Sequence, residues 1–217
     1  MYQKKLWVMA GMLSLMSSTV FANPIIPSSW TGIYNDEQKI SLFFKQNGSK
    51  LTGKSILDGK EFPFVGAIKP NGEITLKEQG SGNSVGVFEF RYIKNKNSME
   101  GSWKSANGQV KPKFFTVDAQ ACQNARGEGN FPDVSVRLLK DADLQVPLGQ
   151  LQYMRNEIYA RHGYAFANKG WASTFAYHEW YMPCYLNVEN RLTSIEKQNI
   201  QRIKMVEPYA KDVEWGR

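Results

Sequence analysis

The sequence predicts an α+β protein of two domains, in which an eight-stranded antiparallel up-and-down β-barrel is followed by a small, mostly helical domain. Between residues 30 and 117, short runs of alternating apolar and polar residues are separated at regular intervals by turn sequences. After residue 119 the apolar residues recur at helical spacing. The first segment holds 12 lysines and one arginine, whereas the remainder holds five lysines and seven arginines. Because arginine suits fixed, partly buried ion pairs, we expect the second segment to use its charges inside the fold.

The first 22 residues have the pattern of a secretory signal peptide. Two lysines precede an apolar run at residues 6–16, which is too short to span a bilayer as a lasting helix. Val20 and Ala22 stand where a signal peptidase reads, so cleavage is expected after Ala22. No cysteine follows the cut that would carry a lipid anchor. The sequence therefore predicts a periplasmic or secreted chain without stable membrane insertion.

Removal of this leader lowers the formal net charge from +7 to +5, because 25 basic residues then face 20 acidic ones. This mild excess favours contact with anionic polymers of the cell envelope. It does not form the basic stripe that nucleic-acid binding requires. We therefore expect no nucleic-acid partner.

The chain has two cysteines, Cys122 and Cys184. In an oxidising compartment the default for such a pair is one disulfide. Closing a loop of about 60 residues would contribute roughly 4 kcal/mol in the chain-entropy model. The alternative, a reactive thiol, lacks a neighbouring base in the sequence. Two histidines and two cysteines show no ligand spacing, so the sequence predicts no metal site and no cofactor.

Eight strands account for the first domain, residues 23–118. The expected strands cover residues 30–34, 39–46, 50–57, 60–68, 73–79, 84–93, 98–103 and 109–117. Asn-Gly and Asp-Gly pairs between several of them supply the positive φ values that tight hairpins need. Because every connection is a hairpin, the strands form a meander, and closing it into a barrel removes the exposed edges.

A repeated pattern supports the barrel. Four strands place an apolar residue two positions before a glycine, at Trp30/Gly32, Leu51/Gly53, Phe64/Gly66 and Met99/Gly101. In a strand the two residues face the same side, and the glycine leaves room for a large neighbour or permits a sharp bend. The opening Trp-x-Gly-x-Tyr and the meander resemble the lipocalin and avidin type of barrel in architecture. A barrel of this size has either a packed interior or a cavity for one small ligand.

Beyond a polar linker at residues 119–130, the chain resembles the YARHG domain of exported bacterial proteins. Four separated blocks carry the resemblance: FPDVSVRLLKDADL, LQYMRNEIYARHGYAF, WASTFAYHEWY and LTSIEKQNIQRIKMVE. They span about residues 131–208, and residues 209–217 follow as a tail. The resemblance implies an extracytoplasmic, compact, mostly helical module, and it implies no reaction. Cys184, after the Trp-Tyr pair, and the scarcity of acidic residues before Arg155 depart from the usual pattern.

The block that names the family also has a plain structural reading. Pro147 suits the first turn of a helix that runs to His162 and stops at Gly163, which tolerates a left-handed conformation. One face of this helix collects Leu148, Leu151, Arg155, Ile158 and His162, with Tyr159 beside it. Glu157 and Arg161, four residues apart on the adjacent face, would stabilise an exposed helix by about 0.2–0.5 kcal/mol.

The functional reading makes His162 a general base, with Glu157 as a second weak catalytic candidate. Positions one and five residues from His162 do not face it on one helix, so its partner would come from elsewhere, from Glu179 or Glu196. The sequence marks no serine or cysteine nucleophile for it. His178, beside Glu179 in an aromatic run, is explained by packing.

Arg155 lies on an otherwise apolar stripe, and a buried charge must be paired. The last helix offers partners, because Thr193 and Glu196 form a capping box and Asn199 lies on its buried face. We expect Arg155 to bind Glu196, Asn199 or backbone carbonyls nearby. Pro208 is expected to end the helix by disfavouring the helical conformation at Glu207.

An unusually aromatic segment lies between these helices. It contains Trp171, Phe175, Tyr177, Trp180, Tyr181 and Tyr185. These rings either form the core of the small domain or present a surface platform for stacking on sugars. The candidate binding residues are Arg155, Tyr159, Arg161, His162, Trp180 and Tyr181.

Together these features predict an exported, non-enzymatic binding protein of the bacterial cell envelope. Its ligand would be an envelope glycan or another envelope or secreted protein. One alternative is an inhibitor or immunity-type protein, which needs a protruding loop that fits an enzyme cleft. The other is a cell-wall hydrolase, which needs a cleft with two carboxylates or a histidine with a nucleophile. The sequence leaves the ligand, the oligomeric state and the presence of a barrel cavity open.

Overall fold

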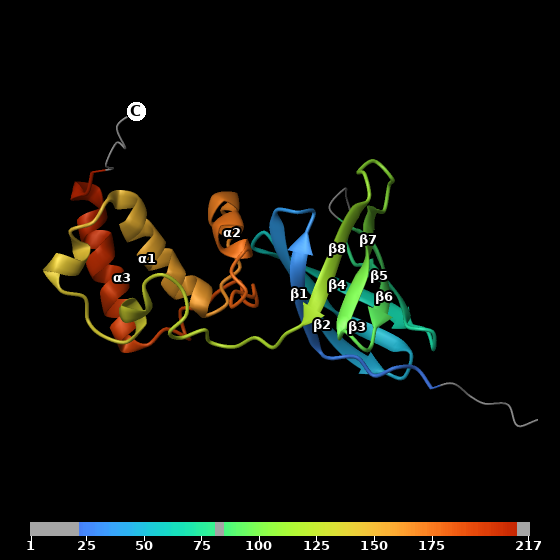
Figure 1. The fold of residues 1–217 in the computed structure, drawn as a ribbon. Coiled ribbons are helices and arrows are strands. Elements are labelled where there is room, and N and C mark those ends of the chain that lie inside the picture. The colour runs from blue at the N-terminus through green and yellow to red at the C-terminus, as the bar shows by residue number, and fades with distance from the viewer. Residues whose placement is uncertain (1–21, 81–84, 212–217) are drawn as a thin grey trace, which may run out of the picture.

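The computed structural model describes residues 22–80 and 85–211. Residues 1–21, and with them the features that predict a signal peptide, lie outside the described part of the chain. Within the described residues, no helix is both long and apolar enough to cross a membrane. Figure 1 shows the two parts of the fold, with the barrel on one side and the helices on the other.

The first part is a closed barrel in which each strand pairs antiparallel with the next and β8 pairs with β1. Its strands are β1 Ser29–Tyr34, β2 Gln38–Asn47, β3 Lys50–Leu57, β4 Lys60–Ile68, β5 Glu73–Glu78, β6 Gly86–Ile93, β7 Ser98–Ser105 and β8 Lys113–Ala119. The predicted up-and-down barrel is therefore confirmed. Closure leaves none of the eight described strands with an unpaired edge that another chain could extend.

The barrel interior is filled by one apolar cluster. Its largest buried side chains include Trp30, Phe64, Phe88, Leu42 and Ile74, all at most 1% exposed. They come from alternating positions of their strands, as the period of two requires. Of the two interiors that the sequence leaves open, the structure has the packed one.

The repeated glycines mark close approaches between neighbouring strands. A Cβ atom added at each would lie 1.8–2.0 Å from a carbonyl oxygen of the adjacent strand, at Gly32, Gly53, Gly66 and Gly101. No side chain fits at that distance, so these positions admit glycine alone. The residue two positions before each glycine is buried in the core, which explains the pattern seen in the sequence.

The second part holds three α-helices and three short 3₁₀ turns. The helices are α1 Leu148–Arg161, α2 Lys169–Ala176 and α3 Ser194–Val206. The 3₁₀ turns are Pro132–Ser135, Asp141–Leu144 and Glu207–Tyr209. Helices α1 and α3 lie side by side, and α2 lies between them and the barrel (Figure 1). The predicted α+β layout is therefore confirmed.

The helix ends follow the sequence signals with one exception. α1 begins after Pro147 and ends at Arg161, and Gly163 has the left-handed φ of +76°. The capping box of Thr193 and Glu196 opens α3. The expectation for Pro208 is wrong in part, because Glu207 keeps helical φ and ψ values of −44° and −43°. At Glu207 the α-helix passes into the 3₁₀ turn Glu207–Tyr209. Pro208 stands in the first part of this turn, where its missing N–H group is not needed for a hydrogen bond.

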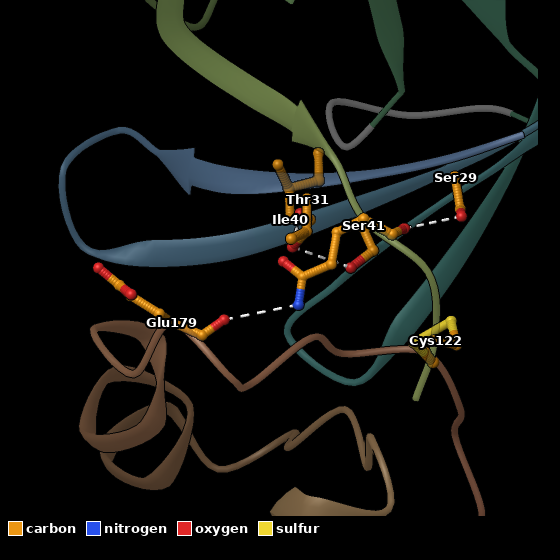
Figure 2. Close-up of a disulfide and its surroundings, with 8 residues drawn as sticks. Ser29, Thr31, Ile40, Ser41, Cys122 and Glu179 are labelled. Atoms are coloured by element: carbon orange, nitrogen blue, oxygen red, sulfur yellow. Dashed lines mark hydrogen bonds between the residues drawn. A yellow bond between two sulfur atoms is a disulfide. The ribbon is translucent and has the colours of Figure 1, made fainter. Parts of the chain in front are cut away.

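A connecting segment, residues 120–130, joins the barrel to the helices. Cys122 in this segment forms a disulfide with Cys184, with the sulfur atoms 2.14 Å apart. Figure 2 shows the hydrogen bonds beside it: Ser29 Oγ donates to the Gln120 carbonyl at 2.7 Å, and the Gln120 amide donates to the Glu179 carbonyl at 3.5 Å. The segment is thus bound to the barrel through Ser29 and to the helical part through Glu179 and Cys184.

The barrel and the helical part also contact each other directly. Lys39 Nζ donates to the His178 carbonyl at 2.8 Å, and the Tyr177 hydroxyl donates to the Asp36 carbonyl at 3.0 Å. Burial lowers the pKa of Lys39 to about 8, and the nearby Glu179 acts in the opposite direction. These contacts place the end of α2 against the β1–β2 hairpin.

Candidate functional site

The charged pair of the YARHG motif is buried. Glu157 Oε2 accepts a hydrogen bond from Arg161 Nη2 at 2.9 Å, and both side chains are 0% exposed. The same guanidinium donates to the Glu128 carbonyl at 2.7 Å and to Ser135 Oγ at 3.2 Å. The weak, solvent-exposed pair considered from the spacing is therefore replaced by a buried, multiply bonded one.

The connecting segment encloses this pair. The backbone amides of Asn130 and Phe131 donate to the two carboxylate oxygens of Glu157, at 2.5 and 2.8 Å. At Gly129, whose φ is +91°, an added Cβ would lie 1.9 Å from Glu157 Oε1. Glycine at this position lets the backbone approach the carboxylate closely enough to bind it.

His162 and Glu196 form a second buried pair. His162 Nε2 lies 2.8 Å from Glu196 Oε2, and His162 Nδ1 lies 3.4 Å from the Asn124 amide nitrogen. Burial alone would raise the pKa of Glu196. Hydrogen bonds from His162, the Thr193 backbone and Ser135 outweigh it and hold the pKa at about 2. Of the two partners considered for His162, the structure supplies Glu196.

This arrangement does not prepare a nucleophile among the described residues. His162 is 3% exposed, and the nearby Ser135 hydrogen-bonds to Arg161 and Glu196 rather than to the imidazole. A general base has to reach the proton that it removes. Glu157, the other weak catalytic candidate, has both oxygens occupied by donors of the protein itself.

Arg155 is paired, although not with the predicted partners. Its Nε donates to Glu207 Oε1 at 2.7 Å, and the two side chains are 21% and 17% exposed. The end of α1 meets the start of α3 through His162 and Glu196, so the helices run antiparallel. Arg155, about two turns earlier in α1, is therefore level with the other end of α3.

Asn199 has a different role from the one considered for it. Its amide oxygen accepts from the Leu139 backbone at 2.9 Å, and its amide nitrogen donates to the Val134 and Arg137 carbonyls at 2.9 and 2.8 Å. Asn199 therefore holds the segment that precedes α1 against α3.

The aromatic segment is mainly core. Phe175 and Tyr181 are 0% and 1% exposed, and the Tyr181 hydroxyl donates to the Tyr164 carbonyl at 2.8 Å. Trp180 is half-buried, whereas Tyr177 is 69% exposed. Among the residues predicted to bind, Arg161, His162 and Tyr181 thus lie in the interior, and only the others reach the surface.

A groove of about 1190 Å³ lies between the barrel and the end of α2. The outer faces of β1, β6, β7 and β8 form one wall, and Ala176, Tyr177 and Glu179 lie on the other. Phe114, 72% exposed, contributes a ring to the barrel wall. The charged lining residues are the acids Asp36, Glu89, Glu100, Asp118 and Glu179 and the bases Lys39 and Arg91.

A smaller hollow of about 330 Å³ lies within the helical part. It is lined by Arg155, Asn156, Tyr159, Tyr164 and residues 186–189. Two of these residues, Arg155 and Tyr159, were predicted to bind. Asn156 and Tyr164 were missed, although they flank the predicted residues in the same block. The sequence predictions also missed Phe114 and Asp118, which line the groove. The one sequence signal for these two residues was that both take outward-facing positions in the alternation of their strand.

Comparison with known proteins identifies the helical part. No curated protein and no solved structure matches the chain. The family model of the YARHG domain matches residues 134–208, which include α1, α2, α3 and both buried pairs. The chain therefore carries a YARHG domain, preceded by a closed eight-stranded β-barrel.

Proposed function

We propose that this protein is an exported, non-enzymatic binding protein of the bacterial cell envelope, and that a glycan binds in the groove between the barrel and α2. The YARHG resemblance, the Cys122–Cys184 disulfide and the leader sequence support export to the periplasm or the medium. The motif charges are occupied inside the fold, so binding has to use other residues.

The observation that carries the proposal is the composition of the groove. Phe114 and Tyr177 both line the groove, and both are more than two-thirds exposed, so two aromatic rings are available to a ligand there. Sugar rings stack on such faces through their C–H groups. The lining carboxylates accept hydrogen bonds from hydroxyl groups, and they outnumber the lining cations by five to two.

Co-sedimentation with purified, protein-free cell-wall glycan tests this proposal. The wild-type protein is expected in the pellet, and the double variant Phe114→Ser/Asp118→Asn in the supernatant. Val65→Ser is the matched control, because Val65 is also exposed but lies on β4 outside the groove. It should sediment like the wild type.

Two results would contradict the proposal. Equal sedimentation of the wild type and the double variant would exclude the groove as the binding surface. If the wild type stayed in the supernatant, glycan binding would be excluded. Capture of an envelope protein by the wild type and not by the double variant would then identify a protein ligand in the same groove.

A further inference from the structure

The hollow beside Tyr159 is lined by residues with polar atoms that form no hydrogen bond to the described part of the chain. Asn156 is 6% exposed, and its amide nitrogen donates to the Gln152 carbonyl at 2.9 Å. Because the partner is a carbonyl, the orientation of the amide is fixed. The oxygen Oδ1 accepts no hydrogen bond from any residue that the structure describes. Oδ1 is not a buried atom without a partner but one that solvent reaches, and Asn156 lines the hollow, so a ligand there can donate a hydrogen bond to it.

The two tyrosines of the hollow are available as well. The rings of Tyr159 and Tyr164 lie 6.0 Å apart with their planes tilted by 55°. Neither hydroxyl hydrogen-bonds to another described residue. Burial, and secondarily Glu189, raises the pKa of Tyr159, while Arg155 acts in the opposite direction. The hydroxyl therefore stays protonated and able to donate at any physiological pH.

Charged groups complete the lining. The Nε of Arg155 is bound to Glu207, while its two terminal nitrogens form no hydrogen bond with the described residues. Glu189 lines the hollow and supplies a carboxylate, and Leu186, which is 45% exposed, supplies an apolar surface. The hollow thus offers donors, acceptors, ring edges and an apolar patch within about 330 Å³, near the lower size limit of small-molecule sites.

We propose that this hollow binds one sugar ring that carries an acetamido group. The acetamido N–H is a donor suited to Asn156 Oδ1, and its carbonyl is an acceptor suited to the free nitrogens of Arg155. The tyrosine hydroxyls and Glu189 bind ring hydroxyls, and the methyl group contacts Leu186. The site lies in the YARHG domain and does not depend on the groove between barrel and α2.

Titration of the full-length, oxidised protein with N-acetylglucosamine tests the proposal by nuclear magnetic resonance. Amide shifts are expected for residues 155–164 and 186–189, with a dissociation constant on the order of millimolar, as few contacts are made. Glucose lacks the acetamido group and is expected to bind more weakly. Shifts that are equal for both sugars would overturn the assignment of Asn156 and Arg155 to the acetamido group.

Two conservative variants test the residues. Tyr159→Phe and Tyr164→Phe remove one hydroxyl each and keep the ring, so the fold is retained. Each should weaken binding by about threefold to tenfold, the usual range for one hydrogen bond. Tyr209→Phe, the same change at a residue that is 84% exposed and outside the hollow, is the control. Unchanged affinity in both hollow variants, or shifts confined to other residues, would overturn the proposal.

The outcome is distinguishable from that of the glycan proposal for the groove. Loss of sedimentation in Phe114→Ser/Asp118→Asn, with normal sugar shifts at residues 155–164, supports both sites. Weaker sugar binding by Tyr159→Phe, read from the shifts at residues 155–164, together with normal sedimentation, separates the hollow from the groove.

Discussion

At the scale of single residues, the pair of Glu157 and Arg161 differs from the surface pairs of the barrel because both of its side chains are 0% exposed. Removal of one partner leaves the other charge buried and uncompensated. Glu157→Gln should therefore lower the free energy of unfolding of the helical part by about 3–5 kcal/mol. Glu61→Gln breaks a pair whose side chains are 39% and 38% exposed and should cost at most about 1 kcal/mol.

Hydrogen exchange at increasing denaturant concentration measures both variants, at residues 148–206 for Glu157→Gln and at residues 30–117 for Glu61→Gln. Equal losses for Glu157→Gln and Glu61→Gln would show that the motif pair contributes no more than a surface pair. The spacing of four residues was readable in the sequence, but an exposed pair and a buried pair have the same spacing. The difference is made by residues 128–131, which reach Arg161 through the Glu128 carbonyl and Glu157 through the Asn130 and Phe131 amides only in the folded chain.

Glu196 links stability to pH. Its folded pKa of about 2 lies below the ordinary value of 4.5, so ionised Glu196 stabilises the fold fully above about pH 4.5. This contribution is lost as the pH falls towards 2, and a shift of this size corresponds to roughly 3 kcal/mol. Denaturation at a series of pH values should show this slope in the wild type. Glu196→Gln should be less stable at pH 6 and should lack this part of the slope. An identical slope in both proteins would contradict the assignment.

At the scale of the elements, the end of α1 depends on backbone conformation. Gly163 has a φ of +76°, and an added Cβ would lie 3.1 Å from the Met182 carbonyl oxygen and 3.2 Å from the Cys184 Cβ. Gly163→Ala should therefore lower the free energy of unfolding by about 1–2 kcal/mol or more. Gly149→Ala, in the first turn of α1 with open space around it, should be neutral or stabilising by up to about 1 kcal/mol.

Thermal melting of both variants separates the effect of backbone strain at Gly163 from the general effect of alanine, since alanine is introduced in each. A stable Gly163→Ala variant would show that the chain ends the helix without a left-handed residue. Helix ends of this kind were predictable because caps and glycines act within a few residues. The partner of Arg155 was not, because it depends on how α1 and α3 are aligned, and Glu207 lies 52 residues away in sequence.

At the scale of the whole molecule, the sequence predicts the barrel itself but not how the helical part packs against it. The strands and their hairpins follow from alternation and turn residues, and the barrel closes because β8 pairs with β1. The groove was not predictable, since its rings come from Phe114 on β8 and Tyr177 after α2. Only the contacts that place α2 on the β1–β2 hairpin bring these residues together.

The disulfide should affect these two parts unequally. Cys122 and Cys184 lie 62 positions apart in sequence, and the loop between them includes α1 and α2, so the link constrains the unfolded helical part and leaves the barrel strands free. In the chain-entropy model its loss costs about 4 kcal/mol. Reduction should therefore increase hydrogen exchange at residues 148–206, while residues 30–117 keep their protection. A Cys122→Ser/Cys184→Ser variant should show the same exchange without reductant and no further change with it. Equal loss of protection in both regions would show instead that the barrel and the helices unfold as one cooperative unit, with the contacts of Lys39 and Tyr177 carrying the coupling between them.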